Sequence, residues 1–154
     1  MGTSFVSIDG EHGFWMRDGV LELFLRLLAL HIPEPTNSDT PKTHEVTRQV
    51  RDQWLLASKG YFQGCVPSRL EEAAATEEGR TVIRTATLSF REALRKSPQS
   101  ISRNALNLLN FEGFEWVEDF ETRRLVETAD AFLSLLEGKV SGTARGTEFM
   151  PGSR

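Results

Sequence analysis

The sequence predicts an all-α fold, a single-domain bundle of about five to six helices. Apolar residues recur at three- and four-residue intervals, and no segment keeps the two-residue alternation of a half-buried strand. Residues 5–8 fit either a short strand or a coil. The 154 residues are 39% hydrophobic and 26% charged, as in one ordinary globular domain. We therefore expect one helical domain over residues 1–138 and a flexible tail over residues 139–154, which is rich in Gly and Pro.

A first helix is predicted over residues 18–31. Asp18 is a favourable N-cap, and Pro33 disfavours continuation of the helix. Glu22 and Arg26 have the spacing of an opposite-charge pair on the helix surface. The predicted apolar face comprises Val20, Leu21, Phe24, Leu25, Leu28 and Ile32.

A second helix begins where Thr40 can act as N-cap and Pro41 occupies the first helical position. It is expected to end at Gly60, and its apolar stripe consists of Val46, Val50 and Trp54. Ser68 and Glu71 have the spacing of a capping box, which predicts a short third helix that ends near residue 75.

The clearest amphipathic pattern covers residues 77–96, where apolar side chains fall on one arc of roughly 120°. Pro98 ends that helix, and Ser100 is expected to cap a short helix that is followed by a loop. A last helix is predicted over residues 119–137, with Gly138 in the C′ position.

Composition limits the classes of function. The longest apolar run, residues 20–32, is interrupted by charges and is shorter than the roughly 20 residues that a membrane helix requires. Residues 1–17 lack the basic start and apolar stretch of a secretory signal, and the single cysteine, Cys65, cannot form an internal disulfide. We expect a cytoplasmic protein in which Cys65 is a partly buried, inert thiol.

No residue pattern indicates an enzyme. The histidines, His12, His31 and His44, are each isolated from other ligands at helical spacing, so no metal site is predicted. The chain has no G-x-S-x-G, phosphate-binding or dinucleotide-binding motif. We therefore expect no cofactor, no metal ion and no catalytic residue.

The acidity of the chain is concentrated in residues 111–121. The whole chain carries a net charge of −4, whereas this segment has five carboxylates, no basic residue and interleaved aromatic side chains. The candidate partner-binding residues of the segment are Glu112, Phe114, Glu115, Trp116, Glu118, Asp119 and Glu121.

Two interpretations of this acidic segment stay open. In the first, its carboxylates favour the N-terminus of the last helix and its aromatic residues anchor the loop in the core. In the second, the segment is an acidic surface that attracts a basic partner and holds it through aromatic anchors. Acid-base catalysis by paired carboxylates ranks last, because nothing in the sequence indicates a substrate pocket.

Four arginines form a stripe on the predicted helix of residues 77–96: Arg80, Arg84, Arg91 and Arg95. Such a stripe can contact phosphates, which gives an alternative function as a helical nucleic-acid-associated regulator. The chain is acidic as a whole, and Phe90, the aromatic residue of this helix, faces the core. A solvated face with intramolecular ion pairs is therefore the favoured interpretation.

Several segments carry a resemblance to a known family. They are residues 13–18 (GFWMRD), 21–31 (LELFLRLLALH), 51–55 (RDQWL), 60–67 (GYFQGCVP), 106–110 (LNLLN) and 132–138 (FLSLLEG). From residue 13 to residue 138, the chain resembles small helical immunity proteins of bacterial polymorphic-toxin systems, in particular contact-dependent growth inhibition immunity proteins.

The resemblance implies a cytoplasmic, non-catalytic protein that binds and neutralises the C-terminal toxin domain of a large secreted effector, often a nuclease. It supplies no universal functional residue, so the predicted binding surface rests on local chemistry. The carboxylates of the acidic segment would pair with Lys and Arg of a basic toxin domain, and Phe114 and Trp116 would supply apolar anchors. The expected partner is thus a protein, with no role for a membrane or nucleic acid and with the oligomeric state left open.

Overall fold

The computed structural model describes residues 2–153 and is 49% helical. Within this range the helices are α1 (Asp18–Leu30), α2 (Pro41–Ala57), α3 (Leu70–Ala74), α4 (Glu77–Arg95), α5 (Arg103–Asn107) and α6 (Thr122–Leu136). Two antiparallel pairs of short strands accompany them: β1 (Thr3–Ser7) with β2 (Gly13–Arg17), and β3 (Ser100–Ile101) with β4 (Phe120–Glu121). The prediction of a mostly helical fold is confirmed, but the stricter prediction of an all-α fold is wrong because of these two sheets.

The β1–β2 hairpin is the main departure from the predicted bundle. Thr3 pairs with Arg17 at its open end, and Asp9 and Gly10 lie in the turn, where Gly10 has a φ of +79°. Asp-Gly between two short runs is a hairpin signal, but strands of five residues are too short for their alternation to stand out against helical periodicity. The buried apolar side chains of the hairpin are Val6, Phe14 and Met16.

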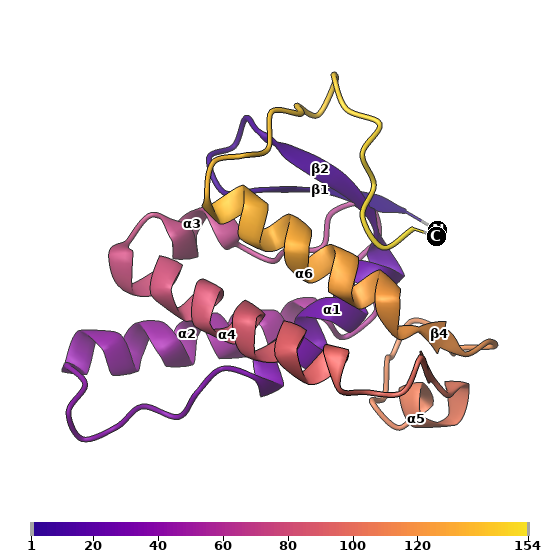
Figure 1. Ribbon diagram of the computed structural model, residues 1–154, viewed down its shortest axis with the longest axis horizontal. Helices are drawn as coiled ribbons and strands as arrows, with labels where there is room; N and C mark the ends of the chain where they lie inside the picture. The colour runs from indigo at the N-terminus through magenta and orange to yellow at the C-terminus, as the bar shows by residue number, and fades with distance from the viewer. Residues whose placement is uncertain (1, 154) are drawn as a thin grey trace.

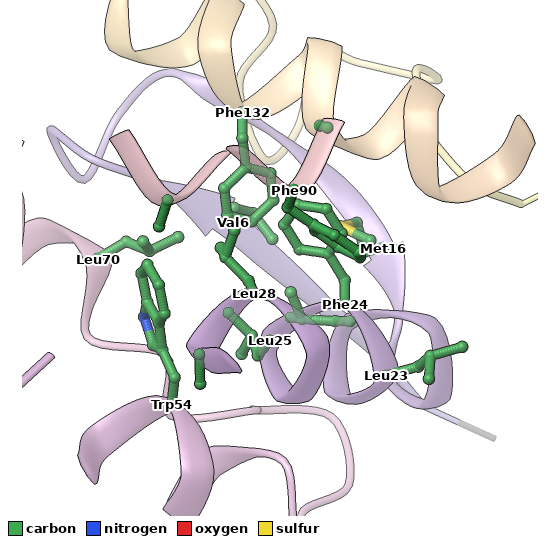
Figure 2. Packing of buried hydrophobic residues seen from close by; sticks show 14 of the residues in the cluster. Val6, Met16, Leu23, Phe24, Leu25, Leu28, Trp54, Leu70, Phe90 and Phe132 are labelled. Carbon is green, nitrogen blue, oxygen red and sulfur yellow. The ribbon is translucent and has the colours of Figure 1, made fainter. Parts of the chain in front are cut away.

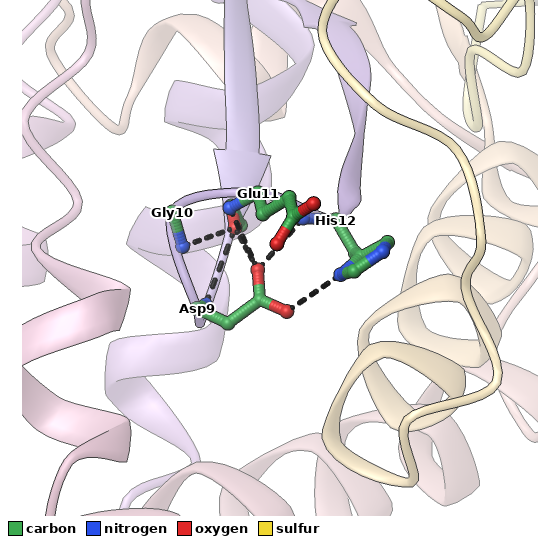
Figure 3. A network of polar contacts seen from close by, with 5 residues as sticks. Asp9, Gly10, Glu11 and His12 are labelled. Atoms are coloured by element: carbon green, nitrogen blue, oxygen red, sulfur yellow. Dashed lines mark hydrogen bonds and ion pairs between the residues drawn. The ribbon is translucent and has the colours of Figure 1, made fainter.

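The turn of the hairpin is held by Asp9 (Figure 3). Its Oδ1 accepts hydrogen bonds from the backbone N of Glu11 at 2.8 Å and of His12 at 2.7 Å, and its Oδ2 lies 2.9 Å from Nδ1 of His12. The bonds from His12 and Glu11 hold the pKa of Asp9 well below its usual range. In return, the Asp9 carboxylate raises the pKa of His12 above 6.5.

The helices form the body of the molecule, and α1 lies at its centre. Figure 1 shows α4 and α6 side by side, with the hairpin on one side of this pair and α2 on the other. Figure 2 shows the side chains of Phe24, Leu25 and Leu28 projecting from α1 into the core. The ring of Phe24 lies 4.6 Å from that of Phe132 on α6 and 5.6 Å from that of Phe90 on α4. Because α1 is covered on most sides, polar residues in it are buried as well.

Four of the predicted helices occur where the apolar periodicity places them. The helices α1 and α4 match their predicted ranges to within a residue at each end. Helix α2 begins at Pro41 with Thr40 as its cap, as predicted, but ends before Gly60, and α6 ends just before Gly138, whose φ is +69°.

Local capping was predicted less well than periodicity. The Ser68 capping box is wrong, because Arg69 is the N-cap residue of α3 and makes no side-chain cap. Ser100 lies in β3, and Ser102 caps α5 in its place. The last helix begins at Thr122 and not at residue 119, since the residues before it pair with β3 as β4.

The segment after α6, predicted to be a flexible tail over residues 139–154, runs beside the hairpin and then turns back to α6, where Nε of Arg124 donates to the carbonyl O of Gly152 (Figure 1). The indole Nε1 of Trp15 donates to the carbonyl O of Ala144 at 3.0 Å, and the ring of Phe149 stands edge-on to Phe14 at 5.8 Å. The low apolar content of the segment gave no sign of these contacts. They cover one face of the hairpin that the helices leave open.

Candidate functional site

The acidic segment, residues 111–121, is a loop that leads into β4 and is built around its aromatic side chains. The ring of Phe114 stacks on Phe111 at 5.1 Å and stands edge-on to Trp116 at 5.4 Å, and Trp116 stands edge-on to Phe120 at 5.5 Å. Phe111 and Phe120 are buried, and Phe114 and Trp116 are half-buried. The aromatic residues therefore attach the loop to the core, while its five carboxylates are all exposed.

Polar bonds join this loop to α5. The side chain of Asn107 binds Trp116 twice, accepting from its backbone N at 2.8 Å and donating to its carbonyl O at 2.9 Å. Oδ1 of Asp119 accepts from the backbone N of Arg103 at 2.9 Å, at the start of α5. Asp119 thus has a structural contact, in addition to its predicted role in partner binding.

Two further carboxylates of the acidic segment form ion pairs within the chain. Glu112 lies 3.8 Å from Nζ of Lys59, and Glu121 accepts a hydrogen bond from Nε of Arg123. The bond from Arg123 lowers the pKa of Glu121. The remaining two, Glu115 and Glu118, have no hydrogen bond or ion pair within residues 2–153. The charge left unpaired in this loop is therefore carried by Glu115 and Glu118.

Apolar side chains near these carboxylates differ from the predicted anchors. Phe114 and Trp116 pack mainly on the core, whereas Leu108 is 85% exposed and Val117 is 75% exposed. Sequence reasoning missed Leu108 and Val117, because apolar periodicity alone does not separate an exposed apolar residue from a core residue. The bonds between Asn107 and Trp116 hold together the two backbone segments that carry these exposed side chains.

A cavity of about 520 Å³ lies between this loop and α1. Its walls include Phe114, Trp116 and Phe120, whose ring contacts are described above, together with Phe62 from the loop before α3. Its charged lining residues are Glu22, Glu115, Glu118 and Asp119, together with Arg17 and Arg124. Arg124 is already engaged, since it lies 4.2 Å over the ring of Phe120 and donates to the carbonyl O of Gly152.

Glu22 also lines this cavity, a position that its predicted surface pairing with Arg26 did not indicate. It is 1% exposed, and its Oε1 has no hydrogen-bond partner among the described residues. The predicted pair with Arg26 is absent from the ion pairs of residues 2–153, because Arg26 donates to Oγ and O of Ser58 and to the carbonyl O of Leu109. Burial raises the pKa of Glu22 to about 7, helped by the nearby Asp18 and opposed by Arg26.

Asp18, one turn before Glu22 on α1, shows how a buried carboxylate is normally satisfied. Its Oδ1 accepts from Oγ of Ser4 at 2.7 Å, and its Oδ2 accepts from the backbone N of Gly64 at 2.7 Å. These bonds tie α1 to β1 and to the loop that contains Cys65. Asp18 is therefore structural, whereas Glu22, a residue of the cavity wall, has a buried oxygen without a hydrogen-bond partner among the described residues.

The arginine stripe of α4 is partly used within the chain. Arg80 donates to the carbonyl O of Leu136 at 2.8 Å, and Arg91 pairs with Asp130 of α6 at 2.9 Å. Arg84 and Arg95 are exposed. The stripe thus joins α4 to α6 and leaves two of its guanidinium groups at the surface.

The remaining candidates add no second site. Cys65 is exposed, so the prediction of a partly buried thiol is wrong. His31 stacks on Phe90 with ring centroids 5.0 Å apart, and burial lowers its pKa. Within residues 2–153 no three His, Cys, Asp or Glu side chains are arranged to hold a metal ion. None of the helices in this range has the length and apolar character needed to cross a membrane.

Fold and site together define a mostly helical protein with an acidic, aromatic-walled cavity at one end. Comparison with models of protein families, with curated proteins and with solved structures gives no match to this chain.

Proposed function

We propose that this protein is an immunity protein, which binds a bacterial toxin domain and neutralises it by protein–protein contact without catalysis. The observation that carries the proposal is the surface formed by Glu115 and Glu118, unpaired carboxylates that flank the exposed Val117 beside Leu108. We name these four residues the acidic face. Exposed apolar side chains ringed by charge are typical of a surface that another protein covers.

The charge of the acidic face specifies the partner. Carboxylates without an internal partner attract a basic protein over several ångströms and raise its association rate, and the apolar side chains then slow its dissociation. A toxin domain that acts on nucleic acid carries the required basic surface, because it must bind phosphates. We infer that the partner is such a domain, often a nuclease in these systems, and that the complex forms in the cytoplasm.

The alternative, a regulator that binds nucleic acid through the α4 stripe, has weaker support. Arg80 and Arg91 bind groups of the chain itself, so only Arg84 and Arg95 are left to contact phosphates. Each phosphate contact favours binding by releasing about one counterion, so two cations alone contribute little affinity at physiological salt.

The test begins with co-expression of the tagged protein and the product of the gene immediately upstream. A stoichiometric basic protein that is toxic alone and harmless with its partner supports the proposal. Recovery of nucleic acid without a protein, or a captured protein whose toxicity persists in the complex, would overturn it.

The acidic face is then tested by kinetics. Glu115→Gln combined with Glu118→Gln should slow association roughly 3- to 10-fold at low ionic strength and flatten its salt dependence. The matched control, Glu45→Gln with Glu71→Gln, removes two exposed charges on α2 and α3, at the end of the molecule opposite α5 and β4 (Figure 1). Equal association rates for the two variants would exclude the acidic face from binding.

A further inference from the structure

We propose that the cavity between α1 and the acidic segment is a binding site for one arginine side chain, with Glu22 as its counter-charge and Trp116 as a hydrogen-bond donor. The site itself is inferred from the cavity. The identification of the arginine as a residue of the toxin domain rests on the proposed function.

The first argument comes from buried polar atoms without a hydrogen-bond partner, of which the described residues contain three: one, Nε1 of Trp54, lies in the core, and the other two belong to residues of this cavity. Oε1 of Glu22 and Nε1 of Trp116 are both buried, both lack a hydrogen-bond partner among the described residues, and both residues line this cavity. A buried polar group without a partner costs about 1–3 kcal/mol in general, so such groups in a folded protein need an explanation. Both atoms are closed off from the open space of the cavity, so a ligand that supplies one donor and one acceptor would satisfy both once the two side chains turn toward it.

The second argument is the chemistry of the walls. Aromatic residues line the cavity, and acidic residues outnumber arginines in its lining by four to two. Guanidinium is the cation best suited to such a place, because it is weakly hydrated, stacks on aromatic faces and donates in a plane to a carboxylate. Arg124 already makes this kind of contact with Phe120 in the same wall.

The third argument is size and the acceptor. A volume of about 520 Å³ lies within the range of sites that hold small molecules, and it admits an arginine residue with its flanking peptide groups. Guanidinium has no acceptor, so it cannot satisfy Nε1 of Trp116. A backbone carbonyl of the same arginine can, which favours an arginine within a peptide chain over a free alkyl cation.

The test uses blocked arginine, N-acetyl-arginine methylamide, as the probe and follows the three indole N–H signals by NMR. The Trp116 signal should shift with a dissociation constant on the order of 1 mM, as expected for a fragment of this size. Trp54, whose side chain is buried in the core, and Trp15, bonded to Ala144, are internal controls that should not shift. The assignment follows from loss of one signal in Trp116→Phe.

Three comparisons decide the outcome. N-acetyl-citrulline methylamide, the neutral counterpart, should bind at least about 10-fold more weakly, since it lacks the charge that Glu22 balances. Propylguanidinium should also bind more weakly, because it has no carbonyl for Trp116. Glu22→Gln should lose about 10-fold in affinity for blocked arginine, whereas Glu11→Gln, at the exposed hairpin turn, should bind as the unchanged protein does.

A Trp116 signal that stays fixed, or equal affinity for arginine and citrulline probes, would overturn the inference. Equal binding by propylguanidinium would overturn the assignment to a peptide arginine. The probe experiment and the search for a toxin partner have independent outcomes. If the probe binds but no basic protein partner is found, only the proposed function is contradicted. If a toxin complex forms but the probe does not bind, only the arginine site is contradicted.

Discussion

The stability of this protein should depend on pH through Glu22. Its pKa is raised from 4.5 to about 7, so the folded protein holds a proton at this site over a range in which the unfolded chain has lost it. Stability from this group is therefore present below about pH 4.5 and is lost as pH rises toward and through 7. At about 1.4 kcal/mol for each pH unit between the two values, the full loss is about 3 kcal/mol.

That loss is a large part of the roughly 5–15 kcal/mol that stabilises a typical domain. The assay is urea unfolding, followed by tryptophan fluorescence, at about pH 5 and about pH 8. Glu22→Gln keeps the shape of the side chain but cannot ionise, so its free energy of unfolding should fall by about 2–3 kcal/mol less over this interval than that of the unchanged protein.

The charges that face Glu22 come from several elements: Asp18 and Arg26 on α1, Arg17 on β2, Arg124 on α6, and Glu115, Glu118 and Asp119 in the acidic segment. The comparison between variants cancels their own titrations to first order, as it cancels those of His12 and His31. Glu115→Gln is the control, because it removes an exposed carboxylate of the same cavity wall. Parallel pH profiles for Glu22→Gln and the unchanged protein would refute the reasoning.

Two further predictions concern the hairpin and the segment packed on it. In an NMR titration His12 should have a pKa above 6.5, and Asp9→Asn should return it toward 6.5; the same pKa in both proteins would show that Asp9 does not act on it. Removal of residues 139–154 deletes the bonds from Trp15 Nε1, Arg124 Nε and the backbone N of Gly13, and at about 1 kcal/mol each it should lower the free energy of unfolding by about 3 kcal/mol. Unchanged stability of the shortened chain, measured by urea unfolding, would mean that the segment is not part of the fold.

The helices were predictable because apolar periodicity reports burial directly. The stripes of α2, α4 and α6 pack on the core as their spacing requires, and Thr40 caps α2 as its position before Pro41 indicates. The β3–β4 pair was not predictable, because two strands of two residues leave no pattern. Its partners are about twenty residues apart, and only packing of the acidic segment brings them together.

The candidate site was predictable in part, for a related reason. Local composition identified the acidic segment, and its candidate residues do lie in one loop. Local composition could not tell which of its carboxylates are paired, since Lys59 lies far from Glu112 in the sequence. It also favoured Phe114 and Trp116 as anchors, because the sequence does not distinguish an aromatic ring exposed to solvent from one packed on neighbouring rings.

The burial of Glu22 was not predicted, because its sequence spacing from Arg26 usually indicates an exposed residue. A Glu and an Arg four residues apart on a helix normally pair in solvent. Here Ser58 and Leu109 supply three acceptors that attract Arg26, and Glu22 is left buried in the cavity. The neighbouring Asp18 shows that the same face of α1 can satisfy a carboxylate when a structural role requires it. An unpaired carboxylate at Glu22 serves no such role and weakens the fold near neutral pH. The proposed arginine site would account for this position, so loss of binding and gain of stability in Glu22→Gln should occur together.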